Sequence, residues 1–319
     1  MDAMNKREAV LNLLQGDDSY TPAAFFLHFD PVYHTGQAAV EKHLEFFRYT
    51  GMDFVKIQFE DGFPHLDSIQ KPEDWAAMPL YKKDFYENQL RIAEGLIRAA
   101  GKEALVVQTL YSPFMCACHT TSSQMVTEHM RQNPAAVKRG MEIITESLMI
   151  FVKELIKLGI DGLYASTQGG EARRFEGASP AESLALFNEC IKPYDLALMR
   201  EASAACPFNI LHICDYSLGY DDLTRFLDYP GQVVNCNLVM ENGVLTAQEV
   251  EQMFGRPFMG GMQRKGVLAT GRPEEVRAAA QDFLRTAPRR MILAADCTVP
   301  SSTPWDNLRA AIEAAHARS

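Results

Sequence analysis

Short runs of strand type alternate with helical patterns along almost the whole chain. Eight such runs occur, at residues 23–30, 53–60, 104–111, 162–167, 208–214, 233–238, 258–262 and 290–297. Between them the spacing of apolar residues predicts helices at 38–49, 88–100, 135–158, 180–204, 221–227, 247–254, 273–286 and from 305 to about 315. Parallel strands need crossover helices, and eight of them close on themselves. The pattern therefore predicts an α/β fold of the TIM-barrel type, (β/α)8, with an open doubly wound sheet as the alternative.

Start and stop signals support several of these helices. Pro180 and Pro273 suit the first helical turn, and Gly51, Gly101 and Gly159 suit helix ends. No tandem repeat, low-complexity tract or linker separates one part of the chain from another, so we expect a single barrel domain over residues 1–319. Two stretches without a clear pattern, 61–86 and 112–133, follow predicted strands and are expected to form lids or pocket walls.

Composition excludes several classes of protein. The 319 residues are 47% hydrophobic and 23% charged, which is typical of a compact globular protein. No apolar run approaches the roughly 20 residues of a membrane helix, and the N-terminus has no secretory signal, so we expect a cytoplasmic protein without a membrane partner. The net charge of −10 disfavours nucleic acid. Seven cysteines in such a chain favour reduced thiols, some of which bind metal.

The most specific group of residues ends the fifth and eighth predicted strands. His212 and Cys214 point to the same face of their strand, roughly 6–7 Å apart, and Cys297 lies at the end of the last strand. One imidazole and two thiolates form a soft donor set that suits Zn²⁺, and three protein ligands leave a fourth position for substrate. Two thiolates also cancel the charge of the ion and leave a bound thiolate nucleophilic. The set therefore predicts a catalytic zinc site suited to alkyl transfer to sulfur.

Other polar residues at strand ends form a second layer of candidates. Asp30 and Glu60 are predicted as catalytic proton acceptors, and Asp61 beside them offers the same chemistry. The fourth zinc ligand is left open between Asp30, Glu60, Glu171, Cys236 and a free position. The expected substrate contacts are His28, Gln108, Tyr111, Gln168 and Asn235. A role for Cys116 and Cys118, which flank Ala117 beside His119, is also left open.

Several segments resemble the uroporphyrinogen decarboxylase superfamily, and within it the zinc-dependent, corrinoid-linked methyltransferases. The superfamily-wide part comprises residues 5–16, 51–56, 159–162, 166–168 and 192–195. The specific part is His212-Ile-Cys214 with the late Cys297, which is similar to the zinc motif of methylcobalamin:coenzyme M methyltransferases. The resemblance implies that these three residues bind zinc. It also implies that a zinc-bound thiolate attacks a methyl group on a corrinoid (cobalamin) cofactor and displaces cobalt.

Two departures bear on the choice of substrate. Decarboxylases of the superfamily carry an Arg-rich segment after the first strand, whereas residues 27–34 contain no Arg, which disfavours decarboxylation. The usual glycine after His-x-Cys is Asp215, and residues 169–174 match no known thiol-acceptor site. The alternatives are a zinc-dependent hydrolase or C–S lyase with Asp30 or Glu60 as base, and a non-catalytic corrinoid-binding protein. The expected partners are a small thiol and a corrinoid protein, with the chain as a monomer or homodimer.

Overall fold

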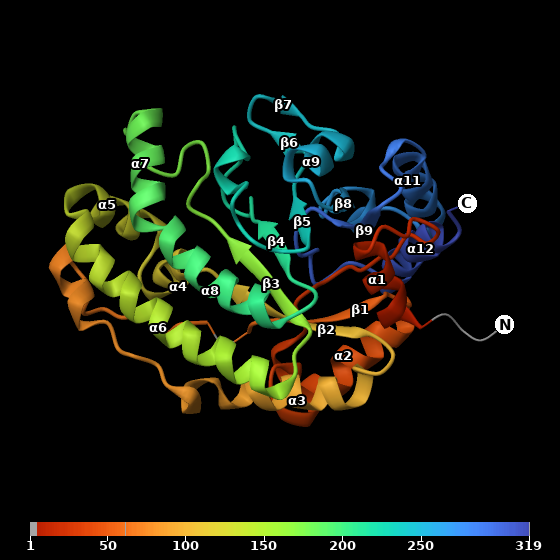
Figure 1. The fold of residues 1–319 in the computed structure, drawn as a ribbon, viewed down its shortest axis with the longest axis horizontal. Helices are drawn as coiled ribbons and strands as arrows, with labels where there is room; N and C mark the ends of the chain where they lie inside the picture. The colour runs from red at the N-terminus through yellow and green to blue at the C-terminus, as the bar shows by residue number, and fades with distance from the viewer. Residues whose placement is uncertain (1–4, 61, 319) are drawn as a thin grey trace.

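The computed structural model describes residues 5–60 and 62–318. Its main sheet is curled and wholly parallel, with the strand order β1-β2-β3-β4-β5-β8-β9 (Figure 1). The strands are β1 Phe54–Ile57, β2 Leu105–Tyr111, β3 Gly162–Thr167, β4 Ile210–Ile213, β5 Val233–Cys236, β8 Phe258–Met262 and β9 Met291–Ala295. A small antiparallel hairpin, β6 Val239–Met240 and β7 Gly243–Val244, follows β5.

The prediction of a regular first strand at residues 23–30 is wrong. This segment lies between β9 and β1 and forms only isolated parallel bridges, Ala23 with Leu293 and Leu27 with Val299. Side chains of the β1 segment take part of its hydrogen bonding: Asp53 accepts from the Ala23 amide at 2.7 Å, and Gln58 donates to the Leu27 carbonyl at 2.8 Å. The segment nevertheless fills the eighth position of the barrel, so the (β/α)8 prediction is confirmed.

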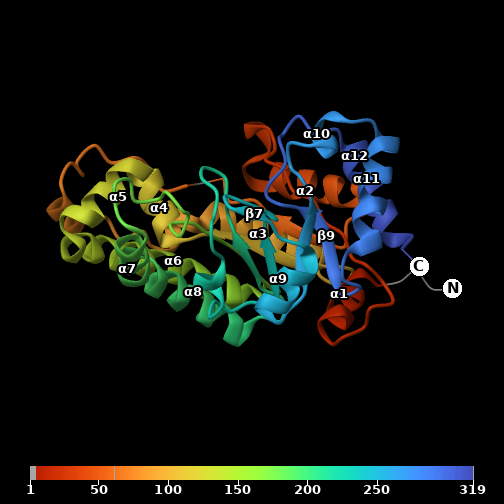
Figure 2. The same ribbon diagram turned by 90° about the horizontal axis from the view of Figure 1, so that it is seen from above.

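Helices surround the sheet (Figure 2). α11 packs on α12, α12 on α2, α2 on α3, α3 on α6, and α6 on α8. Their bounds are α1 Lys6–Leu14, α2 Gly36–Thr50, α3 Glu87–Ala100, α6 Pro134–Leu158, α7 Pro180–Cys190, α8 Lys192–Ala205, α9 Ala247–Phe254, α10 Val267–Thr270, α11 Pro273–Thr286 and α12 Trp305–His316. Across residues 5–60 and 62–318, none of the helices has the length and apolar character needed to span a bilayer.

Two helix predictions need correction. Residues 180–204 form two helices rather than one, because Pro193 supplies no amide hydrogen to a continuous helix and clashes with its preceding turn. Residues 221–227 form only the short 3-10 turn η4, Thr224–Phe226.

The two stretches that had no clear pattern contain regular structure. Residues 112–133 form α4 Pro113–Thr120 and α5 Ser123–Gln132, whose first turns are capped by the side chains of Ser112 and Ser122. The described part of 61–86 contains two 3-10 helices, η2 Pro72–Ala77 and η3 Lys83–Tyr86. Helix α4 contributes a wall of the cavity described below, so the expectation of a pocket wall is met there.

A buried carboxyl group between α8 and β3 makes stability depend on pH. Asp195 is 2% exposed, and one carboxylate oxygen accepts from Thr167 at 2.5 Å and from Tyr229 at 3.1 Å. Its other oxygen has no hydrogen-bond partner among the described residues. Burial raises the pKa of Asp195 from 3.8 to about 7, against the opposing effect of these two hydrogen bonds.

Asp195→Asn is therefore expected to change the pH dependence of stability. Between pH 4 and 7 the folded protein binds more protons at Asp195 than the unfolded chain, so wild-type stability falls as pH rises. The variant lacks this loss. The difference in free energy of unfolding between variant and wild type is therefore expected to shift in favour of the variant by roughly 2–4 kcal/mol from pH 5 to pH 8. Urea unfolding at the two pH values measures the difference, with exposed Asp18→Asn as control. An equal effect of Asp195→Asn at both pH values would contradict the assignment.

Candidate metal centre and its cavity

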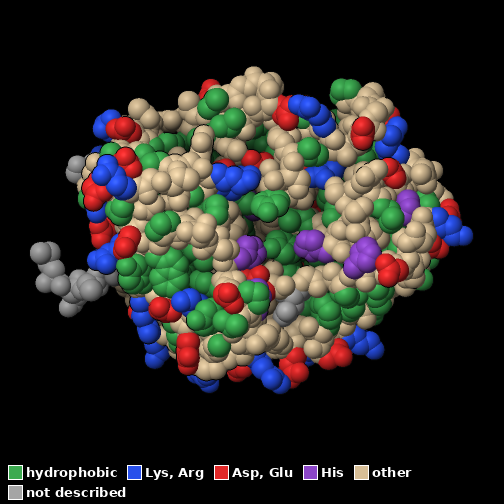
Figure 3. All heavy atoms as spheres, turned by 180° about the vertical axis from the view of Figure 1, so that it is seen from behind, with side chains coloured by type: hydrophobic (Ala, Val, Ile, Leu, Met, Phe, Trp, Pro, Cys, Tyr) green, Lys and Arg blue, Asp and Glu red, His purple; other side chains and the backbone are tan. Residues whose placement is uncertain are grey.

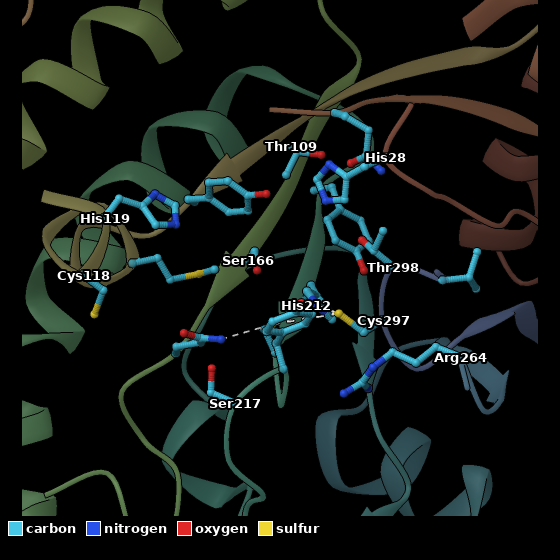
Figure 4. A pocket seen from close by; sticks show the side chains of 18 of the residues that line it. His28, Thr109, Cys118, His119, Ser166, His212, Ser217, Arg264, Cys297 and Thr298 are labelled. Carbon is cyan, nitrogen blue, oxygen red and sulfur yellow. Dashed lines mark hydrogen bonds between the residues drawn. The ribbon is translucent and has the colours of Figure 1, made fainter. Parts of the chain in front are cut away.

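A cavity of about 610 Å³ opens at the carboxyl ends of the strands. Its walls come from the ends of β1 to β4, from α4, and from the segments after β8 and β9. Figure 3 shows this hollowed face with histidine side chains around the opening, and Figure 4 shows the lining side chains converging on the interior. The position is the one at which TIM barrels carry their active sites.

Three buried side chains of types that can bind a metal meet on one wall of this cavity. His212 lies on β4, Cys214 follows the same strand, and Cys297 follows β9. Cys297 Sγ lies 3.4 Å from His212 Nε2 and 4.0 Å from Cys214 Sγ, and all three donor atoms lie within 4.8 Å of one another. Tetrahedral zinc with ordinary bond lengths places such atoms roughly 3.5–3.8 Å apart. The donor types and their spacing therefore fit one zinc ion.

The backbone around these ligands continues the sheet. The Cys214 amide donates to the Thr167 carbonyl at 3.0 Å, and the Asp296 amide donates to the Met262 carbonyl at 3.0 Å. Alternation along an extended strand directs His212 and Cys214 to the same side. Hydrogen bonds that continue the sheet thus reach Cys214 itself and the residue before Cys297.

The two thiols are electrostatically unequal. A hydrogen bond with Cys297, supported by His212, holds the pKa of Cys214 well below its ordinary value despite burial. Gln168 Nε2 also donates to Cys214 Sγ at 3.4 Å, which stabilises a thiolate there. The His212 ring packs against Tyr164 with ring centroids 4.9 Å apart. Of the two thiols, Cys214 is therefore the one that these contacts favour as a thiolate.

An ion-pair cluster joins the two chain segments that carry the thiols. Arg264 Nη1 lies 2.8 Å from Asp215 and 2.6 Å from Asp296, and its amide donates to Asp296 at 2.6 Å. Asn237 donates to the other oxygen of Asp215 at 2.6 Å. Asp215 follows Cys214 and Asp296 precedes Cys297, so Arg264 ties the ligand segments together. Asp215, which replaces the usual glycine after His-x-Cys, thus has a structural role. Arg264 was not predicted from the sequence.

The predicted carboxylates fall in different places. Glu60 has both oxygens within 3.0 Å of His28 Nδ1, and His28 lines the cavity. Asp30 is exposed, accepts from the Val32 amide at 3.1 Å, and lies in a neighbouring groove rather than in the cavity. Asp61 lies outside the described residues.

The other candidate ligands are engaged elsewhere. Glu171 is fully buried against Arg174, and its second oxygen also accepts from the Gly169 amide at 2.8 Å. Cys236 is buried on β5, outside the three-residue donor group. Cys116 is buried in α4, and Cys118 lines the cavity. Across residues 5–60 and 62–318, neither cysteine belongs to a second group of metal-binding side chains.

The predicted substrate contacts divide into two sets. His28, Tyr111 and Gln168 line the cavity. Gln108 and Asn235 are fully buried and lie outside that lining. Gln108 accepts from Gln89 at 3.2 Å, and Asn235 accepts from the Tyr164 hydroxyl at 2.6 Å. These two amides brace the wall behind the cavity.

Like Arg264, the charged residue Lys56 lines the cavity and was not predicted from the sequence. Lys56 lies on β1, is 4% exposed, and donates to Gln58 at 2.5 Å. Its ammonium lies 4.6 Å from the ring centre of Tyr164, and burial lowers its pKa to about 7. The sequence did contain a signal for Lys56, because it is a lone lysine within a predicted buried parallel strand. Both faces of such strands are covered, so a lysine there is expected to be buried.

Comparison with known proteins gives one family match. The model of the family described as Uroporphyrinogen decarboxylase (URO-D) matches residues 32–318. A search of the curated proteins finds no match.

Solved structures show the same fold at low sequence identity. A methyltransferase from Methanosarcina mazei has a TM-score of 0.74 and 14% identity, covering 98% of each chain. A B12-independent methionine synthase from Shewanella sp. has a TM-score of 0.54 and 13% identity, covering 92% of this chain and 96% of that one. A putative B12-independent methionine synthase from Listeria monocytogenes has a TM-score of 0.57 and 13% identity, covering 86% and 84%. At these identities the likeness establishes the fold alone.

Proposed function

Because the chain belongs to the uroporphyrinogen decarboxylase family, we propose that it is a zinc-dependent methyltransferase that moves a methyl group from a corrinoid to a small thiol. The observation that carries the proposal is the set of His212, Cys214 and Cys297, at tetrahedral spacing on a cavity wall. When bound there, zinc would hold the thiol as a thiolate and lower its pKa while leaving the sulfur nucleophilic.

The protein residues support this chemistry in three ways. Two cysteine thiolates cancel the charge of a divalent ion, which keeps a bound sulfur electron-rich. The Arg264 cluster fixes the separation of the two ligand segments. The cavity volume of about 610 Å³ admits a small thiol.

The distribution of acids favours transfer over hydrolysis or C–S cleavage. No Asp or Glu is among the described residues that line the cavity. Glu60 is bound to His28, and Asp30 caps the 3-10 helix η1, Pro31–Tyr33. The carboxylates next to the proposed ligands in the sequence, Asp215 and Asp296, are both paired with Arg264. The described lining therefore contains no unpaired carboxylate that could act as the base of the alternative reactions.

The proposal is tested with zinc-loaded protein, methylcobalamin and a panel of small thiols. We expect loss of the cobalt–methyl absorption and formation of the methyl thioether with at least one thiol. A corrinoid protein carrying the methyl group is the second donor to try, because the corrinoid can be free or protein-bound. If fully loaded protein transfers methyl from neither donor to any thiol, the proposed reaction is wrong.

Gln168→Leu is expected to weaken zinc binding by about 10- to 100-fold without unfolding the protein. The reason is loss of the 3.4 Å hydrogen bond to Cys214 Sγ, since partners that hydrogen-bond to metal ligands typically contribute this much. Competition with a chromophoric chelator measures the affinity. Gln132→Leu, at an exposed position of α5, is the control. Equal affinity in wild type and Gln168→Leu would show that this contact does not support the site.

A further inference from the structure

A thiol that becomes a methyl acceptor must lose its proton, and the cavity offers few groups to take it. The described lining contains no carboxylate. Burial raises the pKa of Tyr111 and of Tyr164, and raises that of Cys118 to about 12, so these groups keep their own protons at neutral pH. Outside the proposed zinc ligands, the histidines and the buried lysine of the described lining remain as candidates, namely His28, His119 and Lys56, whereas Lys265 is exposed.

His28 is the candidate whose ring is oriented for this task. Its Nδ1 lies 2.8 and 3.0 Å from the two oxygens of Glu60. Glu60 is itself flanked by His34, whose Nε2 lies 3.9 Å from it. Burial opposes ionisation of Glu60, but the hydrogen bond from His28 and the neighbouring positive charges hold its pKa below the ordinary value. A hydrogen bond from Nδ1–H to Glu60 fixes the tautomer whose lone pair is on Nε2, and Nε2 is then the atom of the ring that can accept a proton.

The backbone places His28 within reach of the metal centre. Leu27 pairs in parallel with Val299, so His28 lies on the segment that neighbours the one carrying Cys297. His28 follows Leu27 by one residue and Cys297 precedes Val299 by two, which separates them by roughly 10 Å along the chain direction. Both side chains line the cavity (Figure 4). The cavity that both side chains line has room for a small thiol.

The two rival groups are less well placed. Lys56 already donates to Gln58 and lies against the faces of Tyr164 and Phe26. The His119 ring packs edge-on against Tyr111 and makes no hydrogen bond to another described residue. Neither has a carboxylate partner within the described chain that fixes its orientation.

We propose that His28 accepts the proton of the substrate thiol, and that Glu60 is the positioning residue that fixes its ring. The S–H bond breaks, its electron pair stays on sulfur, and the proton forms an N–H bond at His28 Nε2. No oxidant or reductant is needed. The His28 side chain is 40% exposed, so the proton then passes to solvent. The inference rests on the proposed function, because it assigns a role in preparing the same thiol.

The test follows thiolate formation directly, in protein loaded with cobalt(II) instead of zinc. Two cysteine ligands already give sulfur-to-cobalt charge-transfer absorption, so the increase in that absorption after mixing with 2-mercaptoethanol or 3-mercaptopropionate reports the step without methyl transfer. His28→Ala is expected to slow it about 100-fold at pH 7, and added imidazole to restore it. Wild-type protein with imidazole is the reference. His65→Ala, an exposed histidine outside the cavity lining, is the matched control and keeps the wild-type rate.

Glu60 is tested by two substitutions that differ in one property. Glu60→Gln keeps an acceptor for Nδ1–H and loses the charge, whereas Glu60→Ala loses both. We expect thiolate formation to be slower in Glu60→Ala than in Glu60→Gln. Both variants lose the charge, so loss of charge alone would give them equal rates. Equal rates would refute the positioning role.

Failure of the His28 assignment can be distinguished from failure of the proposed function. A wild-type rate in His28→Ala, or a slow rate that imidazole does not restore, overturns the assignment of His28. The assignment of His28 is also overturned if His119→Ala or Lys56→Met slows thiolate formation and His28→Ala does not. If neither thiol increases the charge-transfer absorption of wild-type cobalt protein, the proposed function itself is contradicted.

Discussion

Cys297→Ser is expected to lower zinc affinity by more than about 100-fold and to abolish measurable methyl transfer, while the barrel stays folded. Removal of one thiolate leaves two protein ligands and one uncompensated positive charge at the metal. Loss of a partner that merely hydrogen-bonds to a ligand costs 10- to 100-fold, so loss of a ligand costs more. Elemental mass spectrometry of the purified variant measures bound zinc, and circular dichroism checks the fold. Cys214→Ser and His212→Ala are expected to behave alike.

Cys236→Ser is the matched control for this experiment. Cys236 is also a buried thiol of the barrel, on the strand next to β4, and it pairs in register with Ile213. It lies outside the donor group, so its replacement is expected to leave about one zinc per chain. Zinc loss in Cys236→Ser but not in Cys297→Ser would move the metal to a different set of residues.

Glu171→Gln is expected to destabilise the protein by about 3–5 kcal/mol. Arg174 and Glu171 have side chains only 3% and 0% exposed, and two guanidinium nitrogens donate to the carboxylate. Neutralising Glu171 leaves a buried guanidinium without its counter-charge, and this is the costly way to break such a pair. Urea unfolding monitored by circular dichroism gives the change in the free energy of unfolding.

Two further variants separate the buried charge from a general effect of substitution. The double variant Glu171→Gln/Arg174→Met removes both charges and is expected to recover much of the lost stability. Glu87→Gln breaks the exposed pair with Arg91 on α3 and is expected to cost about 0.5 kcal/mol or less. A double variant as unstable as Glu171→Gln alone would show that unpaired charge is not the cause.

The convergence of His212, Cys214 and Cys297 could be predicted from the sequence because a local rule and the barrel topology act together. Alternation along a strand puts His212 and Cys214 on one side, and closure of the barrel brings the end of the last strand to the same opening. Helices such as α11 were predicted within their true bounds because proline and acidic residues mark the first turn. The break between α7 and α8 could also have been predicted, because Pro193 marks the first turn of a new helix.

The rest of the site depends on contacts between distant segments. Glu171 resembles a free loop acid until folding places it against Arg174 with no access to solvent. Arg264 lies 49 positions from Asp215, and nothing in its local sequence marks the pair. The segment 23–30 has strand-like composition, but the side chains of Asp53 and Gln58 replace part of its ladder. No local pattern encodes these replacements.

X-ray absorption at the zinc edge, before and after addition of a thiol substrate, tests the central proposal most directly. The protein as purified is expected to show about one zinc per chain with two sulfur ligands and nitrogen from one imidazole. Addition of the thiol is expected to raise the sulfur count around zinc from two to three. Zinc that is absent despite metal-supplemented purification, or a sulfur count that does not change with any thiol of the panel, would contradict the proposed thiol activation.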